Sequence, residues 1–266
     1  GKSDNDSDRK PGDAHADLDK AANAAVSGAF GNAGQSCSAR TRLFVQRNVL
    51  DEFTERFVAA TKRFRVGDPM VLATSMVRLA GDRIASRAID DRIGAYVVLE
   101  ALRQLAEDPP AAAIAAVATA QEEIGQSGGG ARTSAYALDP AVALVVDVTF
   151  STDVPDIEKK ELGEHKIGGG PVLSRGSAAH PVVFEMLVEA AEAEGVPYTI
   201  QAQPKATRTD ADAIFLSRVG VPTGLISIPN RYMHSPNELI SLADVGHAIR
   251  LIGAFVRRLG ADVDLT

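Results

Sequence analysis

The sequence predicts an α/β protein in which buried strands alternate with amphipathic helices. Ten small apolar residues occupy positions 111–120, and a second apolar run occupies 141–146. Uninterrupted runs of this kind are typical of strands buried on both faces of a parallel-rich sheet. A chain of 266 residues, 45% of them hydrophobic, is long enough to bury such a core in one or two domains. The segment before the first run has helical periodicity instead, with one apolar face formed by Val98, Leu99, Leu102 and Leu105.

The composition argues against several classes of function. A net charge of −7 and a pI near 5.3 disfavour nucleic acid or an anionic membrane as a partner. The absence of tryptophan and a 5% aromatic content leave few platforms for stacking bases. No apolar run reaches the roughly 18 residues of a membrane-spanning helix. A single cysteine, Cys37, and a charged N-terminus without a signal-peptide core predict a cytoplasmic protein.

The first quarter of the chain predicts two helices and little else. Residues 1–13 are polar and charged, and we expect them to be disordered. Apolar residues at helical spacing predict one helix over 18–29 and a second over about 49–64. A glycine-rich turn, Cys37 and a short strand at 43–46 lie between them.

Beyond residue 76 the pattern changes to short strands, helices and loops. We expect short strands at 77–79, 84–86, 172–174, 198–202 and 223–228. Helices are expected over 181–195 and 210–219, and loops over 128–130 and 151–171. Ser241 and Asp244 have the spacing of a capping box, which predicts the start of the final helix.

Carboxylates follow the two long apolar runs at the point where each run ends. Glu122 and Glu123 come after 111–120, and Asp147 comes directly after 141–146. In open α/β sheets, chemistry collects beyond the carboxyl ends of the strands. Two adjacent glutamates repel unless a cation or a shared proton separates them. The pair therefore predicts a metal ion, with one carboxylate as a ligand and the other free to act as a base; a solvated strand end is the alternative.

A histidine and a further aspartate join this set. His234 follows the strand expected at 223–228, and Asp90 opens a helix, so both should converge with the other carboxylates on one sheet edge. One imidazole with several carboxylates suits zinc, cobalt or manganese. Two such ions, about 3.5–4 Å apart, can activate a water and polarise a carbonyl. Taken singly, Asp147 also fits a turn cap, and His234 fits an ordinary loop histidine.

Six motifs in this part of the chain have a specific order and spacing. They occupy 88–94 (AIDDRIG), 121–125 (QEEIG), 146–149 (VDVT), 168–171 (GGGP), 209–211 (TDA) and 232–238 (YMHSPNE). Residues 77–260 thereby resemble the catalytic domain of tetrahedral aminopeptidases, the co-catalytic metallopeptidases also called glutamyl aminopeptidase or endoglucanase M. The resemblance implies a three-layer α/β/α zinc-peptidase sheet. It also implies a hydrolase that removes N-terminal residues from peptides with the help of two divalent metal ions. Zinc or cobalt is the expected metal, with manganese as the next choice.

The resemblance implies a role for each site residue. Asp90 would bridge the two metal ions, Glu123 and Asp147 would each add one terminal carboxylate, and His234 would add a terminal imidazole. Such a set of ligands holds both ions through residues from four separate segments of the chain.

Two further residues would serve the reaction itself. Glu122 would be the general base that takes a proton from the bridging water, a short transfer because the metal already lowers the pKa of that water. Asp91 would follow Asp90 through a strained peptide bond of the cis form.

The chain departs from the family's pattern in three places. The family has another metal histidine in a His-x-Asp-Glu motif upstream of these motifs; His15-Ala16-Asp17 is a weak match to it. The family also has an inserted β-domain, used in assembling large oligomers, so a homo-oligomer stays an open expectation here. Arg208 stands where the family usually has glycine. The alternative reading is therefore a catalytically impaired relic or fusion that binds one metal ion.

Residues 1–76 resemble a different family. The stretches 16–21 (ADLDKA), 30–37 (FGNAGQSC), 44–46 (FVQ), 51–53 (DEF) and 66–70 (VGDPM) are similar to the catalytic-cysteine region of aldehyde dehydrogenases. The position of Cys37 matches that family's nucleophile, yet no base or cation nearby would make it a thiolate. We therefore expect a helical N-terminal segment over 1–76 and a metallopeptidase domain over 77–266, with an aldehyde dehydrogenase fragment as the distant alternative.

Overall fold

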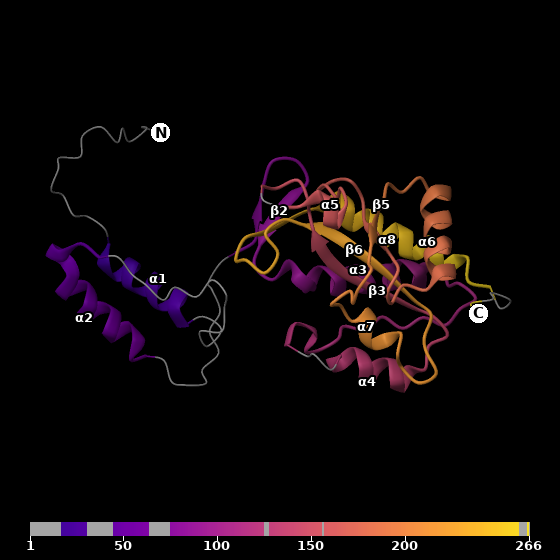
Figure 1. The fold of residues 1–266 in the computed structure, drawn as a ribbon, viewed down its shortest axis with the longest axis horizontal. Helices are drawn as coiled ribbons and strands as arrows, with labels where there is room; N and C mark the ends of the chain where they lie inside the picture. The colour runs from indigo at the N-terminus through magenta and orange to yellow at the C-terminus, as the bar shows by residue number, and fades with distance from the viewer. Residues whose placement is uncertain are drawn as a thin grey trace. The chain divides into compact units, whose positions relative to one another are not determined.

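The chain forms two compact units, Gly1–Ala73 and Thr74–Thr266 (Figure 1). The computed structural model describes residues 17–30, 45–63, 75–124, 128–155, 157–260 and 265. Residues 1–13, which we expected to be disordered, lie outside the described residues. His15, Cys37 and part of the strand expected at 43–46 lie outside them as well. The assignment of 1–76 and 77–266 to two families' domains stays a prediction.

In the first unit, two helices pack through small and aromatic side chains. Helix α1 (Leu18–Phe30) and helix α2 (Leu50–Thr61) confirm the two predicted helices, with a short 3₁₀ turn, η3 (Arg47–Val49), before the second. Ala22, Ala25 and Phe53 are buried where they meet. Arg56 adds ion pairs to Asp19 and Glu52, each at 2.6 Å, but these are exposed and contribute little stability.

A mixed four-stranded sheet forms the centre of the second unit. Its strands are β3 (Ala143–Phe150), β6 (Thr223–Asn230), β4 (Val172–Arg175) and β5 (Thr199–Ala202), in the order β3-β6-β4-β5. Strands β3 and β6 pair in parallel over their full length, β4 and β5 also pair in parallel, and β4 runs antiparallel to β6. These four strands confirm the apolar runs expected from the sequence, with shifts of a few residues at their ends.

Helices cover both faces of this sheet, which gives three layers (Figure 1). Along β3, Val146 and Val148 join the large core under α3 (Ile89–Glu107), α6 (Pro181–Ala193) and α8 (Leu242–Arg257), whereas Val145 joins a smaller core on the other face. This alternation is the two-residue period of a strand. Short helices α4 (Gly129–Leu138) and α7 (Ala211–Ile214) belong to the second face, and α5 (Lys159–Leu162) lies in the loop after β3.

A small antiparallel sheet stands beside the central one. It consists of β1 (Val77–Arg78), β2 (Arg83–Ser86) and β7 (Glu238–Ser241). The first two were expected and β7 was not. The hydroxyl of Ser241 accepts a hydrogen bond from Ala243 N–H at 3.2 Å, so this residue caps α8 as predicted. Asp244 instead accepts hydrogen bonds from the N–H groups of Gly168 and Gly170, at 2.7 and 2.8 Å, and fixes that glycine loop.

Several predicted elements differ from the structure. Residues 111–120 are not a strand: they have no regular secondary structure, and no ladder joins them to another described strand. Leu99 is 53% exposed, and Val97 is the buried residue in its place, because the inward face of α3 is set by Val97, Ala101 and Leu105. The helix expected over 210–219 ends at Ile214, and residues 129–130 begin α4 rather than forming a loop.

Candidate metal centre

The structure brings the predicted site residues together from four segments. Asp90 and Asp91 stand at the start of α3, and Asp147 lies within β3. Glu122 and Glu123 form most of a single 3₁₀ turn, η4 (Glu122–Ile124). His234 lies in the loop between β6 and β7. The site residues therefore converge as expected, but the prediction that Asp147 follows the end of a strand is wrong, because β3 continues to Phe150.

Two groups of three potential ligands share one aspartate. In the first group, His234 Nε2 lies 3.0 Å from Asp90 Oδ2 and 3.4 Å from Glu123 Oε2. In the second group, Asp90, Asp91 and Asp147 each offer a carboxylate oxygen, and these atoms all lie within 4.8 Å of one another. Among the described residues, Asp90 is thus the one that belongs to both groups. A carboxylate shared in this way is the arrangement by which two-metal sites hold their ions close together.

The backbone at the start of α3 is unusual. The Asp90–Asp91 peptide bond is cis, as the resemblance implied. Neither residue has helical dihedral angles, so the regular helix begins only after Asp91. The N–H of Gly94 donates a hydrogen bond of 3.0 Å to Asp91 Oδ1 and orients that carboxylate.

A buried glutamate that sequence reasoning did not single out joins two of these segments. Glu238 is 1% exposed. Its Oε2 accepts hydrogen bonds from Ile89 N–H at 2.5 Å and from Asp90 N–H at 3.0 Å, while its Oε1 accepts one from His234 N–H at 2.8 Å. His234 itself has φ of 63°, in the left-handed region that L residues rarely adopt. Glu238 therefore holds the backbone of Asp90 and of His234 in fixed relation.

The carboxylates of the centre have raised pKa values because negative charge is concentrated where water is scarce. Burial raises the pKa of Asp91 to about 9, with Asp147 as the next cause, and burial raises that of Asp147 to about 8. The pKa of Asp90 rises to about 6 through burial and then the charge of Glu123. Such a cluster needs protons or a cation to be stable, so this donor set fits a divalent metal ion.

Glu122 belongs to neither ligand group, and its carboxylate lies near a different aspartate, Asp210. Its pKa is raised to about 7, first by burial and then by the charges of Asp210 and Glu123. Asp210 accepts a hydrogen bond of 2.5 Å from the hydroxyl of Thr119, and burial raises its pKa as well. Asp210 was predicted only as part of the TDA motif. Its place beside Glu122 follows from the loop before α7 and could not be inferred from spacing.

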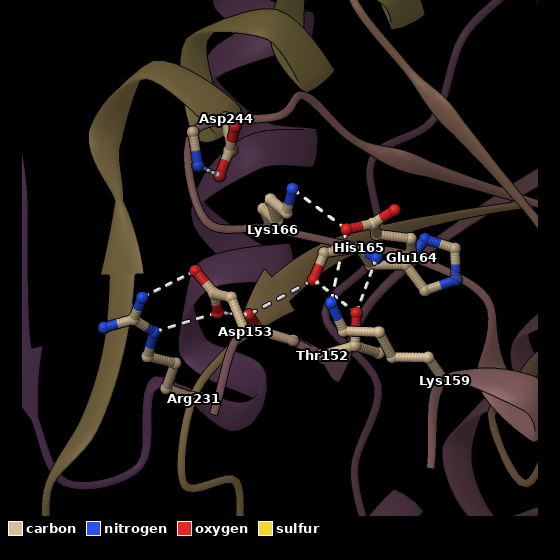
Figure 2. Close-up of polar contacts among 10 residues, drawn as sticks. Thr152, Asp153, Lys159, Glu164, His165, Lys166, Arg231 and Asp244 are labelled. Atoms are coloured by element: carbon tan, nitrogen blue, oxygen red, sulfur yellow. Dashed lines mark hydrogen bonds and ion pairs between the residues drawn. The ribbon is translucent and has the colours of Figure 1, made fainter. Parts of the chain in front are cut away.

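An ion pair supports the loop that carries His234. Arg231 Nε donates to Asp153 Oδ1 at 3.0 Å, and Arg231 Nη2 lies 2.5 Å from Asp153 Oδ2 (Figure 2). Both side chains are about one fifth exposed, and Ser151 also donates to Asp153. Because Asp153 follows β3 and Arg231 follows β6, the pair joins the end of the strand that contains Asp147 to the start of the loop that carries His234.

The other described histidines lie outside the two ligand groups. His165 is buried, with Nδ1 at 2.7 Å from the Thr199 hydroxyl and Nε2 at 2.7 Å from the Leu162 carbonyl. Its backbone also bonds Thr152 in the network of Figure 2. His180 and His247 belong to neither group. Arg208 is exposed, and its N–H donates to Asp212 at 2.7 Å.

Comparison with known proteins gives the family. A model of the M42 glutamyl aminopeptidases matches residues 38–251. The chain belongs to the M42 glutamyl aminopeptidase family. Lysyl aminopeptidase of Pyrococcus furiosus, for example, is 39% identical over 196 residues, which make up 74% of this chain and 55% of that protein. This M42 chain therefore spans about half the length of the curated relatives it matches.

Solved structures agree with the M42 assignment and confirm the α/β fold. The TET aminopeptidase of a marine sediment Thaumarchaeota archaeon has a TM-score of 0.66 and 33% identity, over 78% of this chain and 58% of that one. Betaine aldehyde dehydrogenase of Brucella anthropi is 39% identical over only 82 residues, 31% of this chain and 16% of that enzyme. The likeness to aldehyde dehydrogenases therefore stays a partial resemblance. Within the residues that the structure describes, no helix is long and apolar enough to cross a membrane.

Proposed function

We propose that this M42 protein is a metal-dependent aminopeptidase acting on peptides. Its metal would be zinc or cobalt, with manganese as the next choice. The observation that supports this most is the sharing of Asp90 between two groups of three ligands. Asp90 would be shared by the two ions, Glu123 and His234 would complete the first ligand group, and Asp147 would serve the second. When bound, the two ions supply an activated water and polarise the carbonyl of the scissile peptide bond.

Glu122 would act as the general base. It adjoins the ligand Glu123 in sequence, and its carboxylate would take a proton from the water and return it to the leaving amine. Without metal, burial and neighbouring carboxylates already raise its pKa to about 7, so this side chain can carry a proton near neutral pH. Asp91 would hold the second group in place, since Gly94 N–H fixes its carboxylate next to Asp90. We propose further that the protein is cytoplasmic, that peptides are its partners and that it self-associates as a homo-oligomer.

A catalytically impaired protein is the second candidate, and one observation favours it. The second ligand group consists of three aspartates, whereas the first includes His234. Borderline metals prefer a mixture of imidazole and carboxylate ligands, so an ion in the second group would be held more weakly than one in the first. Such a protein would bind one metal ion without turnover.

Metal content and hydrolysis distinguish the two candidates. The full chain would be equilibrated with zinc or cobalt, analysed by mass spectrometry for metal, and assayed on aminoacyl-p-nitroanilides. An aminopeptidase should bind two ions, and Glu122→Gln should lower kcat at least a hundredfold while both ions remain bound. Glu189→Gln, an exposed glutamate on α6, is the matched control and should leave turnover unchanged. One ion or none, with no turnover, would contradict the proposal. Binding of a nicotinamide cofactor would instead favour the aldehyde dehydrogenase alternative.

A further inference from the structure

A cavity of about 350 Å³ lies among the C-terminal parts of helices α3, α6 and α8 (Figure 1). Its lining comes from the last turns of α3, from the second half of α8 and from Glu194, which ends α6. Ligand pockets in proteins have volumes of about 300–1,000 Å³. None of the residues that line this cavity belongs to the two ligand groups of the metal centre. It is therefore a separate place at which a small molecule could bind.

Positive charge dominates the lining of this cavity. Arg250, Arg257 and Arg258 line it together with one acidic residue, Glu194. Asp108, the C-cap of α3, lies near Arg257 and adds a second carboxylate. Three guanidinium groups against two carboxylates leave an excess of one positive charge, on a chain whose net charge is −7. Basic side chains stabilise helix C-termini, so this excess alone does not indicate a ligand.

The hydrogen bonds of two arginines go beyond what the helix ends need. Arg250 Nη2 donates to the Glu194 carbonyl at 2.7 Å, and Arg258 Nη1 donates to the Ala254 carbonyl, also at 2.7 Å. A guanidinium group has five N–H donors. Within the part of the chain that the structure describes, these two groups make no other hydrogen bond. Each is therefore held in place through one N–H and keeps its other donors for a ligand.

The ion pairs around the cavity are too long to use those donors. Arg257 Nε lies 3.8 Å from Asp108 Oδ2, and Arg258 Nη2 lies 3.7 Å from Glu194 Oε1. Hydrogen bonds between these atom types are about 2.7–3.2 Å long. Asp108 is also 87% exposed, so water screens its charge from Arg257. Neither carboxylate therefore saturates the arginine that it faces.

Gly253 lets Arg257 lie close to the helix. A Cβ atom at position 253 would stand 3.2 Å from Arg257 Nη1, closer than ordinary van der Waals contact. The guanidinium group of Arg257 thus lies against bare main chain, one turn before its own position on α8. This glycine is buried within a helix, where alanine would be the better helix former. Its presence keeps Arg257 beside the cavity.

The chemistry of the lining selects the class of ligand. The planar fork of a guanidinium group matches the oxygens of a phosphate group, and it can donate two parallel hydrogen bonds to them. The rest of the lining includes the apolar side chains of Ala101, Leu105 and Ile249. A phosphate group held by arginines, with or without a small apolar group attached, satisfies both parts of the lining.

We propose that this cavity binds a phosphate dianion, either free or at the end of a small phosphomonoester. Arg257 and Arg258 donate hydrogen bonds to the phosphate oxygens, and Arg250 adds a third positive charge. The apolar side chains from α3 and α8 contact the organic group when one is present. The proposal does not depend on the proposed aminopeptidase activity, because the site shares no residue with the metal centre.

A titration followed by ¹⁵N NMR tests this on the full chain. The protein is treated with a chelator and dialysed, so that no metal ion offers phosphate another site, and sodium chloride keeps the ionic strength constant. Inorganic phosphate should shift the Nε–H signals of Arg257 and Arg258 and the Gly253 amide along one saturable curve. The Nε–H of Arg132, exposed on α4, should not follow this curve. Shifts that do not saturate, or that sodium acetate reproduces equally, would overturn the proposal.

Phenyl phosphate distinguishes the two sources of the phosphate group. Tighter binding of phenyl phosphate than of inorganic phosphate would identify a phosphomonoester as the ligand. Equal or weaker binding would identify free phosphate.

Three variants test the role of Arg257. Arg257→Gln should weaken phosphate binding at least tenfold, whereas the matched control Arg132→Gln should change it less than twofold. Gly253→Ala should weaken binding about threefold, because the added Cβ displaces the end of Arg257, while thermal unfolding shows no loss of stability. If Arg257→Gln bound phosphate as tightly as the parent chain, the arginines would serve the helix ends alone and the proposal would be wrong.

Discussion

Replacing Asp147 by asparagine should stabilise the metal-free protein at alkaline pH. Burial raises the pKa of this carboxyl to about 8, from 3.8 in water. A carboxyl whose pKa is higher in the folded state than in the unfolded state binds more protons when folded. Stability is therefore greatest at acidic pH and falls as the pH rises from about 4 to about 8. Asparagine carries no charge to be buried, and its side-chain oxygen can still accept the hydrogen bond from Val148 N–H.

The pKa shift sets the size of the effect. Four units at about 1.4 kcal/mol each give an upper limit of about 5.5 kcal/mol for one carboxylate at pH 8 and above. Asp91, whose pKa is about 9, takes up a proton in the same cluster and relieves part of this cost. We therefore expect Asp147→Asn to raise the free energy of unfolding at pH 8 by about 2 kcal/mol.

Urea unfolding of chelator-treated protein at pH 5 and pH 8 measures this prediction. The gain should be large at pH 8 and small at pH 5, while Glu189→Gln should show no change at either pH. Added zinc should reverse the order at pH 8, because the parent gains a ligand that the variant has lost. A variant less stable than the parent at pH 8 without metal would refute the assignment of a buried, charge-strained carboxylate.

Two further predictions concern proton release and the loop that carries His234. Zinc affinity, measured by competition with a chelator, should rise about tenfold per pH unit between pH 6 and 8, because Asp147, with a pKa of about 8, releases a proton when the metal binds. The rise should be steeper below pH 6, where Asp90 also releases a proton, and an affinity independent of pH would contradict this. Asp153→Asn should weaken the half-buried pair with Arg231, cost about 1–3 kcal/mol on urea unfolding and reduce metal affinity roughly tenfold. Normal metal binding in that variant would show that the pair does not support His234.

The sequence was sufficient for the elements with long, regular patterns. Helices α6 and α8 and strands β3 and β6 are where periodicity and uninterrupted apolar runs predicted them. The convergence of the site residues was predicted from carboxylates that follow apolar runs, although Asp147 lies within β3 and residues 111–120 are not a strand. The motif order then supplied individual roles, which stay predictions until they are measured.

The predictions that were wrong or missing concern features that depend on residues distant in the sequence but close in space. A run of alanines such as 111–120 can extend, but whether it becomes a strand depends on an adjacent edge, and in the described residues that edge is missing. Asp244 has capping-box spacing, yet it bonds the glycine loop at 168–170, because that loop lies against the start of α8. Glu238 looks like one more loop carboxylate until the three N–H groups that surround it are seen.

The position of Glu238 has a consequence for the thermodynamics of the centre. It organises Asp90 and His234 through their main chains, so the entropy of bringing these two ligands together is lost during folding and not when a metal ion arrives. Removing its carboxylate would move that loss into the binding step. Metal affinity and the cooperativity of folding would then change together, although Glu238 belongs to neither ligand group.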